Sequence, residues 1–418
     1  MGGSTSRGQP PVIADCRAPV YCVKKIGGRH MLLGGGGGAA KTGIVNQIEV
    51  NNFYFDLNYG KKIVNIKKNR IYVTINVVCL YYLFNSVIDS FAHLRKKKIP
   101  NCPTAMRAKL IDKIDTGTHS TMNMDVVCCS HPEHGKYLIA AGHDQVKYSE
   151  YCHKCVRFDR STLGQRLVTG GADGHVRVWD VRDIIENRNP EVLRHPLTDI
   201  SAHCGDVDDI DISYDGRIII SVGYDGRVIL WDIITGRRIY EVPDLPELSR
   251  YKVNIYELCK IPTNLVRSVR FANLGAGENN HVFVAAYNEI QRSSRSSCFL
   301  TLWTYNRERQ SLRPIVVKQA RKGETISALC LSSCGSFTGI GTMGGSVAIF
   351  DTHEMKLLRF IKETHGIFVT GVEFLDNTAK DIRLPPLADG SVRNIPGAAA
   401  CARTCLISLS ADQTVQFL

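Results

Sequence analysis

The feature that most constrains the fold is a repeated segment that closes on tryptophan and aspartate. Residues 171–180 read GADGHVRVWD, and residues 223–232 read GYDGRVILWD. Weaker copies lie at residues 341–351 and 410–417, and residues 299–303 supply another closing strand. Each copy predicts a strand, a tight turn of the Asp-Gly type and a second strand of alternating polarity.

Further apolar strands recur ahead of these turns. They lie at residues 166–169, 218–222, 337–341 and 406–410, with earlier ones at 207–212, 325–331 and 369–374. Four short strands in roughly 40–50 residues is the period of WD repeats, and His203 and His365 stand where such repeats place a histidine. One repeat cannot bury its faces alone, so several must close into a ring. We therefore predict an all-β, seven-bladed WD-repeat β-propeller over residues 16–418, and a β-sandwich would lack the repeated register.

Two regions disturb the repeat. Residues 59–108 are rich in Lys, Asn, Ile, Tyr and Phe, and we predict an insert of doubtful structure there, between the first and second blades. Its uncharged run Ile71–Ile88 leaves three readings open: a disordered insert, translated non-coding sequence, or a membrane segment flanked by basic residues. Residues 143–155 are too few to finish one blade and begin another, which predicts a blade that lacks a strand. Residues 1–15 are predicted to be a disordered N-terminus.

The charge does not by itself indicate a partner. The formal net charge is +12, but much of the excess lies inside the insert, at residues 61–70 and 95–98. Such a local bias differs from a basic binding face, and no nucleic-acid recognition module accompanies it, so we do not expect nucleic acid as a partner. The 15 cysteines are scattered and no secretory signal precedes them, which favours reduced thiols in a cytosol-facing protein.

The most unusual segment is the glycine loop, defined here as Gly34–Asn46. It begins with five consecutive glycines and continues AAKTGIVN. Glycines have no side chains to cover the backbone amides and carbonyls. Ordering five of them costs conformational entropy, and a simple hairpin connection would not need so many. The loop therefore suits an ion or phosphate nest, or close backbone approach by a partner.

One alternative for the glycine loop is a P-loop. Residues 35–42 match G-x-x-x-x-G-K-[ST] except that Ala40 replaces the second glycine. A P-loop must open a helix whose N-terminus faces the phosphates. Here Ile44, Ile48 and Val50 indicate a returning strand, so we expect no nucleotide to be bound by this chain.

The glycine loop closely resembles the first-blade loop of the endoplasmic-reticulum guanine-nucleotide exchange factors that start coat protein complex II assembly, the prolactin regulatory element-binding protein family. Residues 335–349 and 365–370 are similar to that family's sixth blade and the opening of its seventh, and residues 115–124 to the start of its second. The resemblance implies a regulator without covalent chemistry, which promotes GDP release from a Sar-type small GTPase. It also implies a place at the endoplasmic-reticulum membrane with the propeller facing the cytosol. Family members carry a C-terminal membrane anchor, and whether one is missing after Leu418 stays open.

The resemblance also implies roles for particular residues. In that family the loop binds a potassium ion, and a large hard cation takes several neutral oxygen ligands. The implied potassium ligands are the backbone of Gly34, Gly35, Gly36, Gly37 and Gly38 and the side chain of Asn46. The implied GTPase-contacting residues are Lys41, Thr42, Gly43, Ile44 and Asn46, with Ile44 as an apolar wedge. A non-catalytic WD-repeat scaffold remains the alternative function.

The other chemistry-bearing residues are given structural roles. A single Cys152-x-x-Cys155 without a second matched pair is a weak signal, so no zinc site is predicted. The turn aspartates are expected to hold turns through Asx hydrogen bonds, and the tryptophans to pack in the core. These residues are Asp173, Asp225, Asp412, Trp179, Trp231 and Trp303.

Overall fold

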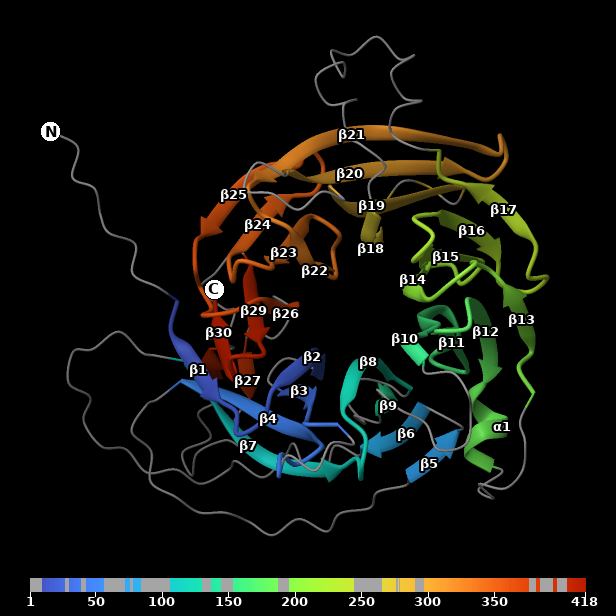
Figure 1. Cartoon of the computed structure of the whole chain (residues 1–418). Coiled ribbons are helices and arrows are strands. Elements are labelled where there is room, and N and C mark those ends of the chain that lie inside the picture. Colours follow the sequence, from blue (N-terminus) through green and yellow to red (C-terminus); the bar gives the residue numbers. More distant parts are fainter. Residues whose placement is uncertain are drawn as a thin grey trace, which may run out of the picture.

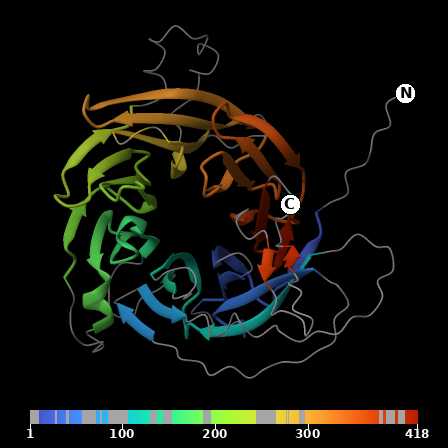
Figure 2. The same cartoon turned by 180° about the vertical axis from the view of Figure 1, so that it is seen from behind.

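In a computed structural model the chain forms a ring of antiparallel sheets around a central channel (Figure 1), and the view from behind shows the same ring (Figure 2). The structure describes residues 10–26, 30–38, 43–55, 72–75, 78–83, 106–129, 137–143, 153–186, 195–243, 265–275, 277, 279–289, 297–375, 381–383, 394–396 and 404–418. These residues contain seven four-stranded sheets, here called blades, and one two-stranded sheet. The predicted all-β propeller is confirmed.

Strands within each blade are given from the channel outward. Blade 1 contains β2 (Val20–Ile26), β3 (His30–Gly35), β4 (Gln47–Phe55) and β7 (Met106–Asp115). Blade 2 contains β8 (Thr121–Cys128), β9 (Tyr137–His143), β6 (Val78–Leu83) and β5 (Tyr72–Ile75). Blade 3 contains β10 (His153–Phe158), β11 (Arg166–Gly171), β12 (His175–Asp180) and β13 (Thr198–Ser201), with the short helices η3 (Arg160–Thr162) and α1 (Val181–Glu186) in its connections.

The remaining blades follow in chain order. Blade 4 contains β14 (Val207–Ile212), β15 (Ile218–Gly223), β16 (Val228–Asp232) and β17 (Arg238–Glu241). Blade 5 contains β18 (Leu265–Ala272), β19 (Asn280–Asn288), β20 (Ser297–Asn306) and β21 (Ser311–Lys322). Blade 6 contains β22 (Ile326–Leu331), β23 (Phe337–Thr342), β24 (Val347–Asp351) and β25 (Lys356–Ile361). Blade 7 contains β26 (Val369–Leu375), β29 (Cys405–Ser410), β30 (Thr414–Phe417) and β1 (Val12–Asp15), and β27 (Asp381–Arg383) pairs with β28 (Asn394–Pro396).

Blades 1 and 2 correct the predictions about the disturbed regions. Residues 59–108 do not lie between the two blades as predicted, because they follow β4 and extend into β7, the third and fourth strands of blade 1. Blade 2 takes its outer strands β5 and β6 from within these residues. β6 pairs antiparallel with β9 from Val78↔Gly142 to Leu83↔Tyr137. Strand β6, which lies in the apolar run, thus supplies hydrogen-bond partners to the outer edge of β9. Residues 72–75 and 78–83 are therefore strands rather than a disordered insert, and the blade near 143–155 does not lack its outer strands.

The rest of residues 59–105, and with it the remainder of the Ile71–Ile88 run, lies outside the described residues. Among the residues that are described, no helix is long and apolar enough to cross a membrane.

The N-terminal strand closes the ring. β1 pairs with β30 in the register Val12↔Gln416, Ala14↔Val415 and Asp15↔Thr414. The prediction of disorder throughout residues 1–15 is therefore wrong for Val12–Asp15. Strand β30 pairs with β29 along one edge. Its other edge needs hydrogen-bond partners, and β1 supplies them.

The turn and core residues take their predicted places. Each of the three tryptophans is buried and donates its indole N–H to a hydroxyl, at 2.9 Å for Trp179, 2.8 Å for Trp231 and 2.7 Å for Trp303. The carboxylates of the three turn aspartates accept backbone N–H groups two residues further on. In blade 4, His203 links the Asp225 turn to Ser221, the hydroxyl that also receives the Trp231 bond. The structural roles predicted for these residues are confirmed.

The innermost strands of the blades line the central channel, a cavity of 380 Å³. Its lining is ionic: Asp209 accepts hydrogen bonds from Arg157 at 3.1 Å and from Arg270 at 2.5 Å. Burial opposes ionisation of the neighbouring Asp125, but Arg160 and then Lys24 outweigh burial and lower the pKa of this carboxyl to about 2. These charges are paired within the chain, so they fix neighbouring blades against one another.

Candidate functional site

The glycine loop lies on one particular face of the propeller. Successive strands alternate in direction, so the turns between second and third strands share a face with the connections between blades. We call it the loop face. Two contacts show how the glycine loop is joined to the connections on either side of blade 1. The Gly36 amide donates to the Pro19 carbonyl at 3.1 Å, and the Ser120 hydroxyl donates to the Gly36 carbonyl at 3.3 Å.

Three of the glycines are required by close packing. A β-carbon on Gly34 would lie 2.7 Å from the Cys22 sulfur, and one on Gly35 would lie 2.0 Å from the Pro19 carbonyl oxygen. Gly36 has a φ of +138°, and a β-carbon there would lie 2.2 Å from Asn46 Oδ1. Side chains at these positions would therefore push the loop away from its neighbours.

The first two glycines belong to strand β3 rather than to the turn. Gly34 pairs with Ile48 and Gly35 with Gln47 across β3 and β4. On the other side, Gly34 pairs with Cys22 of β2. The part of the glycine loop outside the ladder thus begins at Gly36, two residues later than the sequence indicated.

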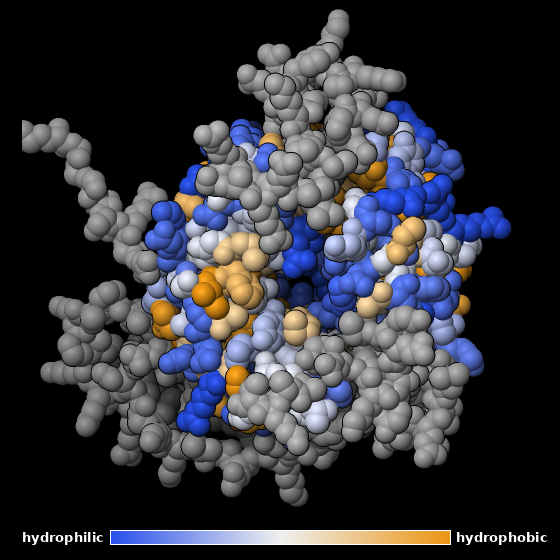
Figure 3. All heavy atoms as spheres, viewed as in Figure 1, coloured by the Kyte–Doolittle hydropathy of each residue, from blue (hydrophilic) through white to orange (hydrophobic). Residues whose placement is uncertain are grey.

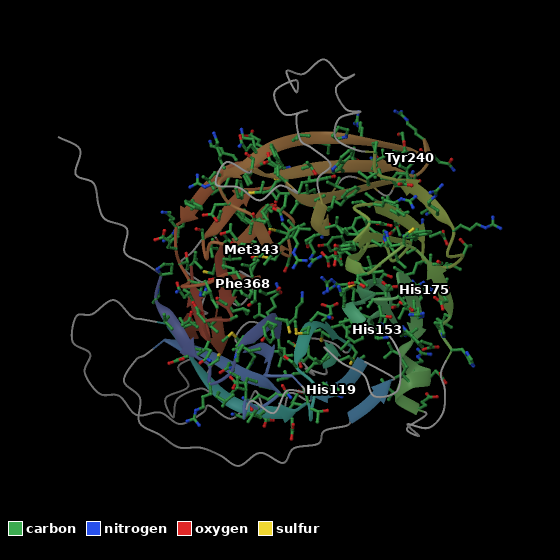
Figure 4. All side chains as sticks on the ribbon, viewed as in Figure 1. His119, His153, His175, Tyr240, Met343 and Phe368 are labelled. Atoms are coloured by element: carbon green, nitrogen blue, oxygen red, sulfur yellow. The ribbon has the colours of Figure 1, made fainter. Side chains whose placement is uncertain are left out.

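Asn46 holds the two ends of the loop together. Its side-chain oxygen accepts the Gly38 amide at 2.9 Å, and its side-chain nitrogen donates to the carbonyls of Gly38 and Gly117, each at 3.1 Å. The Thr116 amide donates to the Asn46 carbonyl at 3.2 Å. Asn46 is only 6% exposed. This side chain therefore positions the loop against the connection to blade 2, which Figure 4 marks by His119.

Two apolar side chains are exposed in the described part of this segment. Ile44 is 36% exposed and Val45 is 60% exposed, just before β4 begins at Gln47. Val45 was not singled out from the sequence, where its only signal is an apolar side chain directly beside Ile44. Lys41 and Thr42, two of the predicted contact residues, lie outside the described residues. Gly43 has a φ of +76° with open space around it, so the backbone turns sharply before Ile44.

The oxygens of the loop are of a type that can coordinate a monovalent cation, and three of them already accept hydrogen bonds within the chain: the Gly36 carbonyl from Ser120, the Gly38 carbonyl from Asn46, and Asn46 Oδ1 from the Gly38 amide. The oxygens at this site are neutral: the carbonyls of Gly36, Gly37 and Gly38, the nearby Gly117 carbonyl and the Asn46 side chain. Neutral, convergent carbonyls are the ligands that replace water around a large monovalent cation. Gly34 and Gly35 differ from the others, because they sit inside the β2–β3–β4 ladder.

The structure also bears on a P-loop and on a zinc site, the two other kinds of site that the sequence suggested. The segment after Asn46 is strand β4, which confirms the returning strand and removes the helix that a P-loop needs. Cys155 is buried, its thiol contacts the carbonyls of Gly170 and Val207, and burial raises its pKa. Its proposed partner Cys152 lies outside the described residues. Among the residues that the structure describes, no three His, Cys, Asp or Glu side chains gather to hold a metal ion.

Comparisons with known proteins agree with this architecture. The family model described as WD domain, G-beta repeat matches residues 150–180 and 194–232, which are the segments of blades 3 and 4. The ring of blades, their Trp-Asp ends and this match define a WD-repeat β-propeller protein.

Within that class, the chain is similar to the mouse protein named guanine nucleotide-exchange factor SEC12, with 27% identity over 212 residues, and to its rat counterpart, with 29% over 213. It is also 27% identical over 213 residues to SEC12-like protein 2 of Arabidopsis thaliana. Each alignment covers 50% of this chain and 44% of the relative, so the chain matches less than half the length of these proteins. The chain is thus a WD-repeat propeller that is similar to SEC12 proteins over half of its length.

Proposed function

We propose that this protein is a guanine-nucleotide exchange factor that promotes GDP release from a Sar-type small GTPase. The observation that carries the proposal is the glycine loop. Hydrogen bonds of the Asn46 side chain hold this loop in place, and Ile44 and Val45, the two residues before Asn46, are exposed. The relatives named as exchange factors support the same class of activity. The protein would act as a regulator of another enzyme and would carry out no covalent chemistry itself.

The proposed mechanism is differential binding. An exchange factor accelerates release only if it binds the nucleotide-free GTPase more tightly than the GDP-bound form. The apolar side chains of Ile44 and Val45 would enter the nucleotide-binding region of the partner, where they offer no hydrogen bonds to replace those of the phosphates. Asn46 would act as a positioning residue, because its own polar groups are already bonded within the chain.

We also propose that a potassium ion binds within the glycine loop. The carbonyls of Gly36, Gly37 and Gly38, with Gly117 and Asn46 beside them, would hold it. When bound, the cation would take these neutral oxygens as ligands and hold the loop in one shape. The predicted contributions of Lys41 and Thr42 to the GTPase contact belong to the same proposal.

The cellular role follows from the same family likeness. We infer that the exchange step starts coat protein complex II budding at the endoplasmic-reticulum membrane, with the propeller on the cytosolic side. The support for this role is the similarity to SEC12 proteins, which extends over half of this chain.

The test is the release of fluorescent GDP from a Sar-type GTPase, with and without this chain, in potassium buffer. The proposal expects faster release with the wild-type chain, and at least tenfold less acceleration with Ile44→Ala. The matched control is Ile234→Ala, which removes an equally apolar and more exposed side chain (73%) from the turn between β16 and β17 on the opposite face. Exchanging potassium for sodium should reduce the acceleration by the wild type.

Two results would contradict the proposal. Unchanged release with folded wild-type protein would reject exchange activity, and stable capture of the GTPase without faster release would establish the scaffold alternative. Equal activity in potassium and sodium would reject the cation site alone.

A further inference from the structure

A second exposed apolar surface lies on the loop face, away from the glycine loop itself. Met343, Ile367 and Phe368 are 44%, 44% and 38% exposed, and we call these three residues the apolar patch. Met343 lies in the turn between β23 and β24, and the other two lie in the connection from blade 6 to blade 7. Figure 4 labels Met343 and Phe368 beside the channel, where Figure 3 shows orange surface on the left and mostly blue surface on the right.

The backbone beneath the apolar patch is held by the fold. The His365 amide donates to the Gly345 carbonyl at 3.0 Å, which joins the connection to the blade 6 turn. The Met343 amide donates to the Thr325 carbonyl at 2.8 Å. The Ser410 hydroxyl donates to the Phe368 carbonyl at 2.7 Å. Exposed apolar side chains on a fixed backbone are a preformed contact surface, and such patches mark sites of association.

The apolar patch and the glycine loop are connected through one blade. Phe368 directly precedes β26, the inner strand of blade 7, and Thr370 of that strand donates to the Val20 carbonyl of β2 in blade 1 at 2.7 Å. The Pro19 carbonyl next to Val20 is the group that accepts the Gly36 amide. A partner seated on the glycine loop therefore meets blade 7 and then blade 6 as it extends along this side of the channel.

The glycine loop alone is too small to hold a protein. A stable interface needs about 20–30 residues on each side, and its central contacts are apolar or aromatic side chains. The glycine loop spans residues 34–46, of which Gly34 and Gly35 lie within the sheet. The partner must therefore cover more of the loop face. The apolar patch is an exposed apolar surface on this face, and blade 7 connects it to the glycine loop.

We propose that the apolar patch is a second contact for the small GTPase, and that it forms one continuous docking surface with the glycine loop over blades 6, 7 and 1. This inference rests on the proposed function and adds residues to it. The glycine loop would act on the nucleotide site, and the apolar patch would supply binding to an apolar surface elsewhere on the same partner. The polar side of the channel mouth would remain outside the interface.

The experiment measures catalysed GDP release as kcat/KM for full-length Phe368→Asp. We expect a fall of at least tenfold, because a charge in a buried apolar contact opposes binding, while the melting temperature of the variant stays within a degree of wild type. Ile367→Ser is the second variant, in case Phe368→Asp does not fold. Ile234→Asp on the opposite face is the matched control, and its exchange rate should equal that of wild type.

The outcomes separate this inference from the proposed function. If the wild-type chain fails to accelerate release, the proposed function fails. If wild type is active and Ile44→Ala is impaired, but Phe368→Asp and Ile367→Ser keep full activity, only the apolar patch is rejected as a GTPase contact. Light scattering measures whether the chain self-associates. If wild type is self-associated and Phe368→Asp is a monomer with unchanged exchange activity, the apolar patch binds a second copy of this chain, and the inference is overturned.

Discussion

Replacing Asn46 by alanine removes the side chain that holds the glycine loop to its surroundings. The wild-type amide accepts one hydrogen bond from the Gly38 amide and donates two, to the carbonyls of Gly38 and Gly117. All three connect the turn either to itself or to the connection that precedes blade 2. The substitution leaves the strands β3 and β4 intact, so its effect is local.

The magnitude follows from those three bonds. Each neutral hydrogen bond contributes about 0.5–1.5 kcal/mol net, and water replaces part of the loss at a site near the surface. We therefore expect the free energy of loop opening to fall by about 1–3 kcal/mol, which raises the opening equilibrium by about 5- to 150-fold. Catalysed GDP release should fall in parallel, because Ile44 would no longer be held in one position.

The assay is amide hydrogen exchange, followed for the Gly38 and Thr116 amides. Their protection should drop in Asn46→Ala by the factor given above, while protection in blades 3 to 6 stays the same. Asn306→Ala is the control, since it removes a side chain that also makes hydrogen bonds, to Asn280 at 2.8 Å and to the Arg309 amide at 2.7 Å, in blade 5. Unchanged protection of Gly38 would refute the positioning role of Asn46.

Three further predictions concern the loop, the ring closure and pH. Gly36→Ala should destabilise the loop by about 1–3 kcal/mol because of its positive φ and the overlap with Asn46, whereas Gly43→Ala meets open space and should cost less in the same hydrogen-exchange assay. Deleting residues 1–15 removes β1 and should lower the urea midpoint of unfolding, and a midpoint equal to wild type would show that β30 does not need this partner. Burial lowers the pKa of His203 and His365, so the unfolded chain binds more protons below about pH 6.5 and stability should fall as the pH is lowered from 7.5 to 5. A urea midpoint that rises over that range would contradict the sign.

Most of the fold could be predicted from local sequence patterns. The Asp-Gly turns, the tryptophans and the apolar strands each depend on neighbours a few residues away, and the structure places them as expected. The strands β5 and β6 could not be placed in blade 2 in this way. β5 pairs with β6, and β6 pairs with β9 although β7 of blade 1 lies between them in the sequence. The pairing of β1 with β30 joins opposite ends of the chain and leaves no mark in a local pattern.

The site was located by composition and resemblance, but its details needed the structure. Five consecutive glycines identify the segment, yet only the contacts show that Gly34 and Gly35 are strand residues and that Asn46 is buried. The apolar patch is assembled from a turn of blade 6 and the connection to blade 7. No spacing in the sequence places these residues on the same face as the glycine loop, because blades 6, 7 and 1 become neighbours only when the ring closes.

The proposed exchange activity requires that this protein binds the nucleotide-free state of a Sar-type GTPase more tightly than the GDP-bound state, and the affinities for the two states measure this difference. Surface-bound chain is titrated with the GTPase stripped of nucleotide and, separately, with the same GTPase saturated with GDP. We predict binding to the nucleotide-free form that is tighter by at least 100-fold, because only a difference in affinity can shift the nucleotide equilibrium. Equal affinities for the two forms would contradict exchange activity, however tightly the chain binds.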